Sequence, residues 1–111
     1  MGVKTRKFEK FHADNPAVYE ALVRLAREWV KRTGRHKVGI ASLFEVARWE
    51  LSLATSDSEY KIANSHKPFY ARLIMAQEKD LAGLFELRPA EADEWLVSRE
   101  RLLFDLRGLH V

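Results

Sequence analysis

Apolar residues at helical spacing, preceded by a capping signal and followed by a glycine, constrain this chain more than any other feature. Asn15 and Pro16 are typical of a helix start, because asparagine caps the first turn and proline suits the first helical position. Gly34 can adopt the left-handed conformation that ends a helix. Between them, one apolar row has intervals of four, three and four residues: Val18, Leu22, Leu25 and Trp29. The pattern predicts a helix over residues 16–33.

Two further stretches have helical patterns. Ser42 and Glu45 form a capping box, which opens a predicted helix over residues 42–55. Its apolar arc is wide, so we expect it to be the central helix: Phe44, Val46, Ala47, Trp49, Leu51, Leu53 and Ala54. Asn64 and Pro68 indicate the start of a third helix, whose residues 69–76 carry one charge. A helix this apolar is buried on most sides, or is buried and also forms an interface.

The segments outside these three helices carry weaker patterns. Residues 1–13 are predicted to be a basic arm, in which Phe8 and Phe11 can dock. The run 35–40 suggests a short strand or an extended linker, and 84–88 suggests a short strand. Residues 89–111 begin with a proline and acidic side chains and carry arginines later, which matches the dipole of a C-terminal helix.

These elements predict a mainly α protein, and 111 residues are enough for a single compact domain. We expect three main helices over 14–88 in helix-turn-helix (winged-helix-like) order, one or two short strands, and the C-terminal helix. The apolar rows supply the predicted core residues, which are Leu22, Leu25, Trp29, Phe44, Leu51 and Ile74. The other two tryptophans, Trp49 and Trp95, are also expected in the core.

Several function classes lack support in the sequence. There is no cysteine, which excludes disulfides, cysteine-based zinc sites and thiol catalysis. There is no glycine-rich phosphate motif, and the histidines are far apart: His12, His36, His66 and His110. The acidic group at 91–94 is explained by the helix dipole. We therefore expect a non-enzymatic protein without a metal or cofactor. With no apolar run long enough to span a membrane and no signal core, we expect it to be cytoplasmic.

The distribution of charge favours DNA as the partner. Residues 1–55 carry eleven basic and six acidic groups, whereas residues 56–111 carry eight basic and ten acidic groups. In winged-helix order the third helix enters the major groove by its first turn, and the preceding linker reaches the backbone. The predicted DNA-binding residues are therefore Arg35, His36, Lys37, Asn64, Ser65, His66, Lys67, Tyr70 and Arg72.

Other interpretations remain open at this point. The cationic clusters can be a solubilising surface, the third helix can be the core of a small bundle, and Arg72 can pair with Glu45 or Glu50. The runner-up function is binding to a host protein through an apolar surface formed by Tyr70, Leu73 or Met75, or by the C-terminal helix. Residues 91–107 contain enough apolar side chains to form a homodimer element.

Three motifs together resemble a known family. They are Phe11-His12-x-x-Asn15-Pro16-x-Val18-Tyr19, Leu43-Phe44-Glu45-Val46-x-Arg48-Trp49-Glu50 and Tyr70-Ala71-Arg72-Leu73-Ile74-Met75. The combination resembles a family of small, largely uncharacterised proteins of actinobacterial phages and prophage-like regions, over about residues 8–88. The family has an Asn-rich stretch where this chain has Ala63-Asn64-Ser65-His66. The resemblance implies a phage origin and no particular activity.

Overall fold

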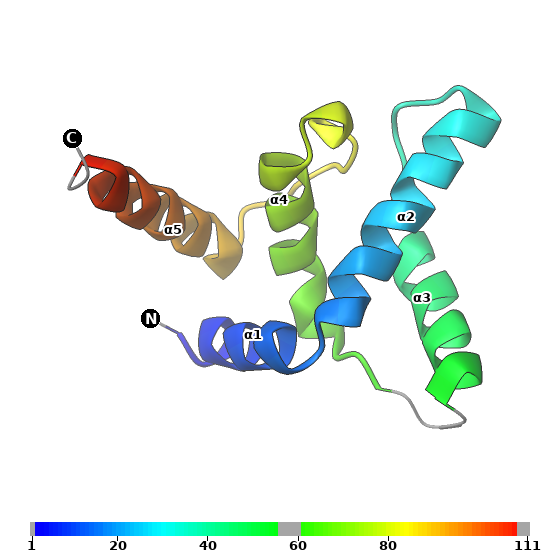
Figure 1. Cartoon of the computed structure of the whole chain (residues 1–111), viewed down its shortest axis with the longest axis horizontal. Helices are drawn as coiled ribbons and strands as arrows, with labels where there is room; N and C mark the ends of the chain where they lie inside the picture. The colour runs from blue at the N-terminus through cyan, green and yellow to red at the C-terminus, as the bar shows by residue number, and fades with distance from the viewer. Residues whose placement is uncertain (1, 56–60, 109–111) are drawn as a thin grey trace.

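The computed structural model describes residues 2–55 and 61–108. These residues contain five α-helices and two short 3₁₀ helices, η1 and η2 (Figure 1). These residues contain no strand, and they fold as one compact all-α domain. In chain order the elements are α1 (Val3–Asp14), α2 (Pro16–Thr33), α3 (Ile40–Thr55), η1 (Asn64–His66), α4 (Lys67–Gln77), η2 (Lys79–Leu81) and α5 (Glu91–Gly108).

The central helix is α4, not the helix predicted over residues 42–55. Every residue of α4 from Phe69 to Ile74 is buried, and α4 packs against α2, α3 and α5. The low charge of this segment in the sequence is thus explained by burial on nearly all sides. Helix α3 buries one face, with Leu43, Phe44 and Ala47, and lies against α2 on the outside of the domain (Figure 1).

The residues predicted to be a basic arm form helix α1 instead. Phe8 is fully buried, and its ring centroid lies 4.9 Å from those of Phe69 and Tyr70 and 5.2 Å from that of Trp95. The backbone N–H and hydroxyl of Thr5 also donate to the Glu91 carboxylate at the start of α5, at 3.1 and 2.6 Å. Helix α1 is therefore held against α4 and α5 at Thr5 and Phe8.

The helix predicted over 16–33 is confirmed, and Gly34 ends it with a φ of 67°. The helix predicted over 42–55 is confirmed except that it begins two residues earlier. Of the two alternatives for residues 35–40, the structure has the linker, and the strand predicted at 84–88 is wrong, because neither segment is a strand in the structure. One backbone hydrogen bond of 3.2 Å joins them, from Val38 N–H to Leu84 C=O, and no ladder forms from it.

The connection from α3 to α4 spans residues 56–66, whereas a helix-turn-helix joins its two helices by a turn of about three or four residues. The connection is therefore longer than the turn of a helix-turn-helix.

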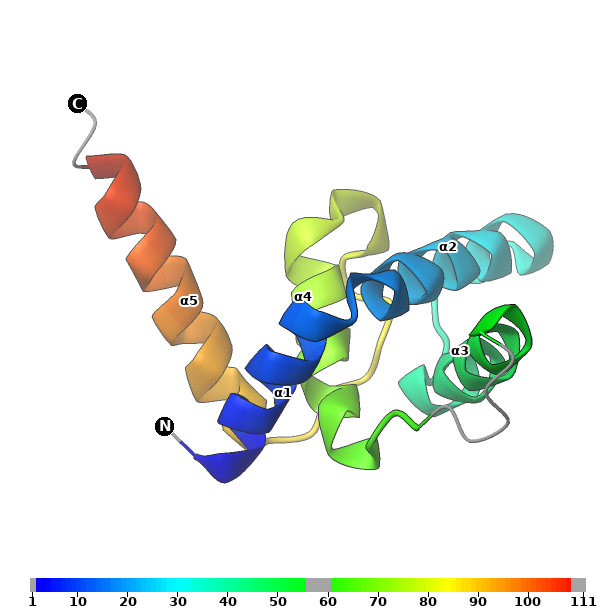
Figure 2. The same ribbon diagram turned by 60° about the horizontal axis from the view of Figure 1, so that its bottom comes forward.

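Helix α5 is continuous through Arg99 and Glu100, but it has two different halves. Its first half packs on α1 and α4, where Ala92 and Trp95 are buried, and its far end lies away from every other helix (Figures 1 and 2). Within the described residues, no helix has both the length and the apolarity needed to cross a membrane.

Candidate functional site

Arg72, predicted to read a DNA base, lies in the protein core. Its side chain is 2% exposed, and the guanidinium donates to Asp93 Oδ1 at 2.6 Å, to Pro68 C=O at 2.9 Å and to Arg88 C=O at 2.6 Å. The hydrogen bond from Arg72, together with one from the Ala90 N–H, holds the pKa of Asp93 below its usual range. The predicted pairing with Glu45 or Glu50 is also wrong. Arg72 joins α4 to the segment before α5, and its guanidinium is shielded from DNA.

Two more predicted DNA contacts, His66 and Tyr70, are buried. The imidazole of His66 stacks on Phe11 with ring centroids 4.7 Å apart, and Tyr70 has no exposed surface. Tyr70 and Leu73 therefore cannot form the apolar contact surface proposed for a protein partner, whereas Met75 is half-buried. Sequence patterns do not distinguish a buried aromatic row from an exposed one when nearly the whole helix is apolar.

The remaining residues at the start of α4 contact α3. Asn64 Oδ1 accepts a hydrogen bond of 2.7 Å from Arg48, which also donates to Glu45 and to the Ile62 carbonyl. Lys67 Nζ lies 5.8 Å from the centroid of the Phe44 ring, within the range of a cation–π contact, and Ser65 is half-buried. These contacts hold the start of α4 against α3.

The linker residues 35–37 lie at the opposite end of α4. His36 Nε2 is 3.0 Å from the Ala82 carbonyl oxygen, and Lys37 Nζ donates to the Gly83 carbonyl at 2.7 Å, while Arg35 is exposed. Helix α4 has 11 residues, so its two ends are about 16 Å apart. The structure does not bring the predicted DNA-binding residues together on one surface.

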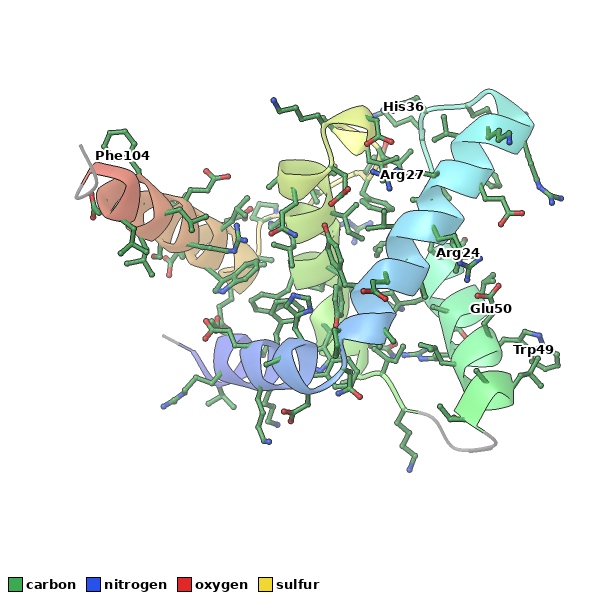
Figure 3. The ribbon with its side chains drawn as sticks, viewed as in Figure 1. Arg24, Arg27, His36, Trp49, Glu50 and Phe104 are labelled. Atoms are coloured by element: carbon green, nitrogen blue, oxygen red, sulfur yellow. The ribbon has the colours of Figure 1, made fainter. Side chains whose placement is uncertain are left out.

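The most exposed tryptophan belongs to an apolar row on α3 that we call the α3 stripe: Val46, Trp49 and Leu53. Trp49 is 65% exposed and Leu53 is 64% exposed, so the prediction of Trp49 in the core is wrong. Trp49 points away from the domain (Figure 3). Ion pairs border the stripe on both sides, Glu45 with Arg48 and Arg24 with Glu50.

A second apolar surface is formed by the far half of α5. Its exposed side chains are Val97, Leu102, Leu103, Phe104 and Leu106. Phe104 is 75% exposed, and it lies at the opposite end of the molecule from Trp49 (Figure 3). Two grooves run beside this half of α5. One is lined by Glu9 of α1 together with Trp95, Arg99 and Leu102, and the other lies toward the end of α4.

A polar network with the residue types of a catalytic site joins α2 to the end of α4 and to η2, and its role is structural. Tyr19 donates to Glu78 at 2.8 Å and accepts from Gln77 at 2.9 Å, and Arg27 donates to both Glu78 and Asp80. Burial and the Glu78 carboxylate raise the pKa of Tyr19 to about 12, so its hydroxyl stays protonated at neutral pH. Across residues 2–55 and 61–108, no three side chains of the metal-binding types are grouped as an ion would require.

No protein-family model, curated protein or solved structure matches this chain.

The position of Arg72 leads to a testable prediction. Arg72→Ala should lower the free energy of unfolding by about 2–4 kcal/mol, because two backbone carbonyls lose their donor and a cavity opens. Arg32→Ala is the matched control, since Arg32 is exposed and its ion pair with Glu28 contributes at most about 1 kcal/mol. Urea denaturation measures both variants. If Arg72→Ala is as stable as the native chain, the buried role is wrong.

Proposed function

We propose that this protein is a non-enzymatic interaction module that binds an apolar helical segment of another protein through the α3 stripe. The observation that carries the proposal is the exposure of Trp49 within a row that continues over two turns of α3. If the chain is phage-encoded, as its resemblance implies, the partner is a host protein met in the host cytoplasm. The DNA-reading role of α4 loses its support, since α4 supplies the core.

The composition of the α3 stripe supports this role. Tryptophan is among the residue types most enriched at positions that dominate the binding energy of an interface. It contributes this energy when surrounding contacts shield it from water. Val46 and Leu53 extend the row on both sides of Trp49, and the two bordering ion pairs supply such a rim. Burial of apolar surface contributes about 25 cal/mol of free energy per Å², so bulky apolar side chains contribute most when a partner covers them.

The same features limit the chemistry of the partner. The rim carboxylates of Glu45 and Glu50 are each paired with an arginine of this chain, so the rim presents no unpaired charge of one sign. A row spaced at three and four residues fits the grooves of another helix. We therefore infer a partner helix with apolar residues at positions i, i+3 or i+4, and i+7, without a strong net charge.

Replacing the stripe tryptophan tests the proposal. Helical peptides selected against the native protein from a displayed library should bind Trp49→Ala at least about 30-fold more weakly, which corresponds to about 2 kcal/mol. Leu87→Ala, which removes an exposed apolar side chain elsewhere, should bind like the native chain. Calorimetric titration measures the affinities, and urea denaturation shows that both variants stay folded. Equal binding by Trp49→Ala, or selected peptides without an apolar row, would contradict the proposal.

The apolar half of α5 supports the expected homodimer over residues 91–107. The row that packs on the domain, including Trp95, continues as Leu102 and Leu106 after the domain ends. Two α5 helices can pair antiparallel along this row, with their crossing level with residue 103. Arg101 of each copy would then lie opposite Asp105 of the other, which makes the contact self-complementary. A second copy therefore fits both the apolar row and its charges.

Two truncations separate dimerisation from folding. Removing residues 102–111 should leave a folded monomer, because Ala92, Asp93 and Trp95 stay in place. Removing residues 90–111 should unfold the domain, since the buried guanidinium of Arg72 loses the Asp93 carboxylate. Sedimentation gives the mass and circular dichroism the helix content. A full chain that is monomeric at high micromolar concentration would refute the homodimer.

DNA binding remains a second candidate, and the feature that favours it is the outer face of α1. Lys4, Arg6, Lys7 and Lys10 are all exposed on this helix. If these four groups contact phosphates, the slope of log affinity against log salt should be about −3 to −4. Their joint replacement by alanine should abolish a gel shift at low salt, equally for all sequences. No shift of mixed duplexes by the native protein at micromolar concentration would exclude DNA.

A further inference from the structure

The contact between α1 and the rest of the domain contains two imidazoles, that of the half-buried His12 and that of the buried His66. His12 lies on α1 and stacks on Phe8, with its ring also 5.6 Å from Tyr19 and 5.7 Å from Tyr70. His66 lies at the end of η1, is 4% exposed, and contacts the α1 rings Phe8 and Phe11.

Among the described residues, no carboxylate stabilises a positive charge on either imidazole. The Nδ1 atom of each ring is buried and has no hydrogen-bond partner among the residues that the structure describes. The charged groups that act on them are cations: Arg99 of α5 on His12, and Lys7 of α1 on His66. Burial and these cations lower the pKa of both histidines from the ordinary 6.5.

The other titratable groups packed around the histidines do not offset a proton. Arg48 and Lys61 line the same shallow pocket as His66, from α3 and from the segment before η1. Beside His12, the Tyr19 hydroxyl of α2 donates to Glu78, and that carboxylate is already paired with Arg27. Glu45 is paired with Arg48. Among the described residues, the surroundings of His12 and His66 are therefore aromatic rings, cations and carboxylates that already pair with arginines.

We propose that α1 is an acid-released latch, which leaves α4 and α5 when His12 and His66 take up protons. Since each histidine binds protons less readily in the attached state, attachment is fully favoured above about pH 6.5 and weakens as the pH falls below that value. Release would uncover Trp95 and the ring of Phe69, which Phe8 covers. Mild acid would thereby open an apolar groove along α4 and α5.

The rest of the domain can stay folded while α1 leaves. Much of the core lies between α2, α3 and α4, where Leu22, Phe44 and Ile74 are fully buried, and none of these belongs to α1. The other anchor of α1, from Thr5 to Glu91, is insensitive to mild acid. Hydrogen bonds from Thr5 lower the pKa of Glu91, so this carboxylate stays ionised. The histidine contacts are therefore the part of the attachment that responds.

Hydrogen exchange of the full-length protein between about pH 7.5 and pH 5 tests the latch. After correction for intrinsic rates, the opening equilibrium of α1 amides should rise below about pH 6.5 by up to about tenfold per pH unit for each histidine, hence by up to about a hundredfold per pH unit for both. The amides of α2 and α3 should keep their protection. The His12→Gln/His66→Gln double variant should remove the pH dependence, and His36→Gln, which alters an exposed histidine, should retain it.

Two results would overturn the proposal. One is equal protection of α1 at both ends of the pH range, and the other is loss of protection in α1, α2 and α3 together. A second measurement covers the case in which the double variant does not fold. In the native protein, the NMR signals of the His12 and His66 rings should titrate below pH 6.5, together with the opening of α1. Titration of both rings without release of α1 would equally reject the latch.

Discussion

The buried guanidinium of Arg72 is the interaction on which the arrangement of α1, α4 and α5 depends. A charge inside a protein is tolerated when its hydrogen bonds are made, and here two carbonyls and one carboxylate accept them. Asp93 also accepts from the Ala90 N–H, so the same carboxylate shapes the first turn of α5. Glu91, in that turn, accepts from Thr5 of α1. These contacts thus form a connected series from α4 through the start of α5 to α1.

The sequence predicted elements well where local chemistry determines them. The bounds of α2 follow from Pro16 and Gly34, whose effects on the backbone depend little on the rest of the chain. Helix α1 escaped prediction because its few apolar or aromatic side chains, among them Phe8, Phe11 and His12, stand among many charged ones. The segments 35–40 and 84–88 have residues suited to strands, but a strand exists through its ladder, which sequence alone does not reveal.

The burial of several predicted binding residues escaped the sequence analysis for a different reason. Arg72 and His66 have side chains that suit DNA, yet packing places both inside, and no local pattern distinguishes these outcomes. Trp49 shows the converse error. Helix α3 has two adjacent apolar rows, and its neighbours cover the row of Phe44 and leave that of Trp49 in water. Which row is covered is decided by the position of α2 and α4, that is, by contacts distant in the sequence.

Helix α5 combines an anchored beginning with an uncovered end, and this affects how its end becomes ordered. Forming the first turn of a helix is the unfavourable step, whereas adding residues to an existing turn is nearly neutral. The contacts of Asp93 and Trp95 supply that first turn within the folded domain. The turns around Phe104 extend a helix that already exists, which makes its free end more helical than the same peptide alone. A molecule that binds there meets a largely preformed surface and loses less affinity to ordering it.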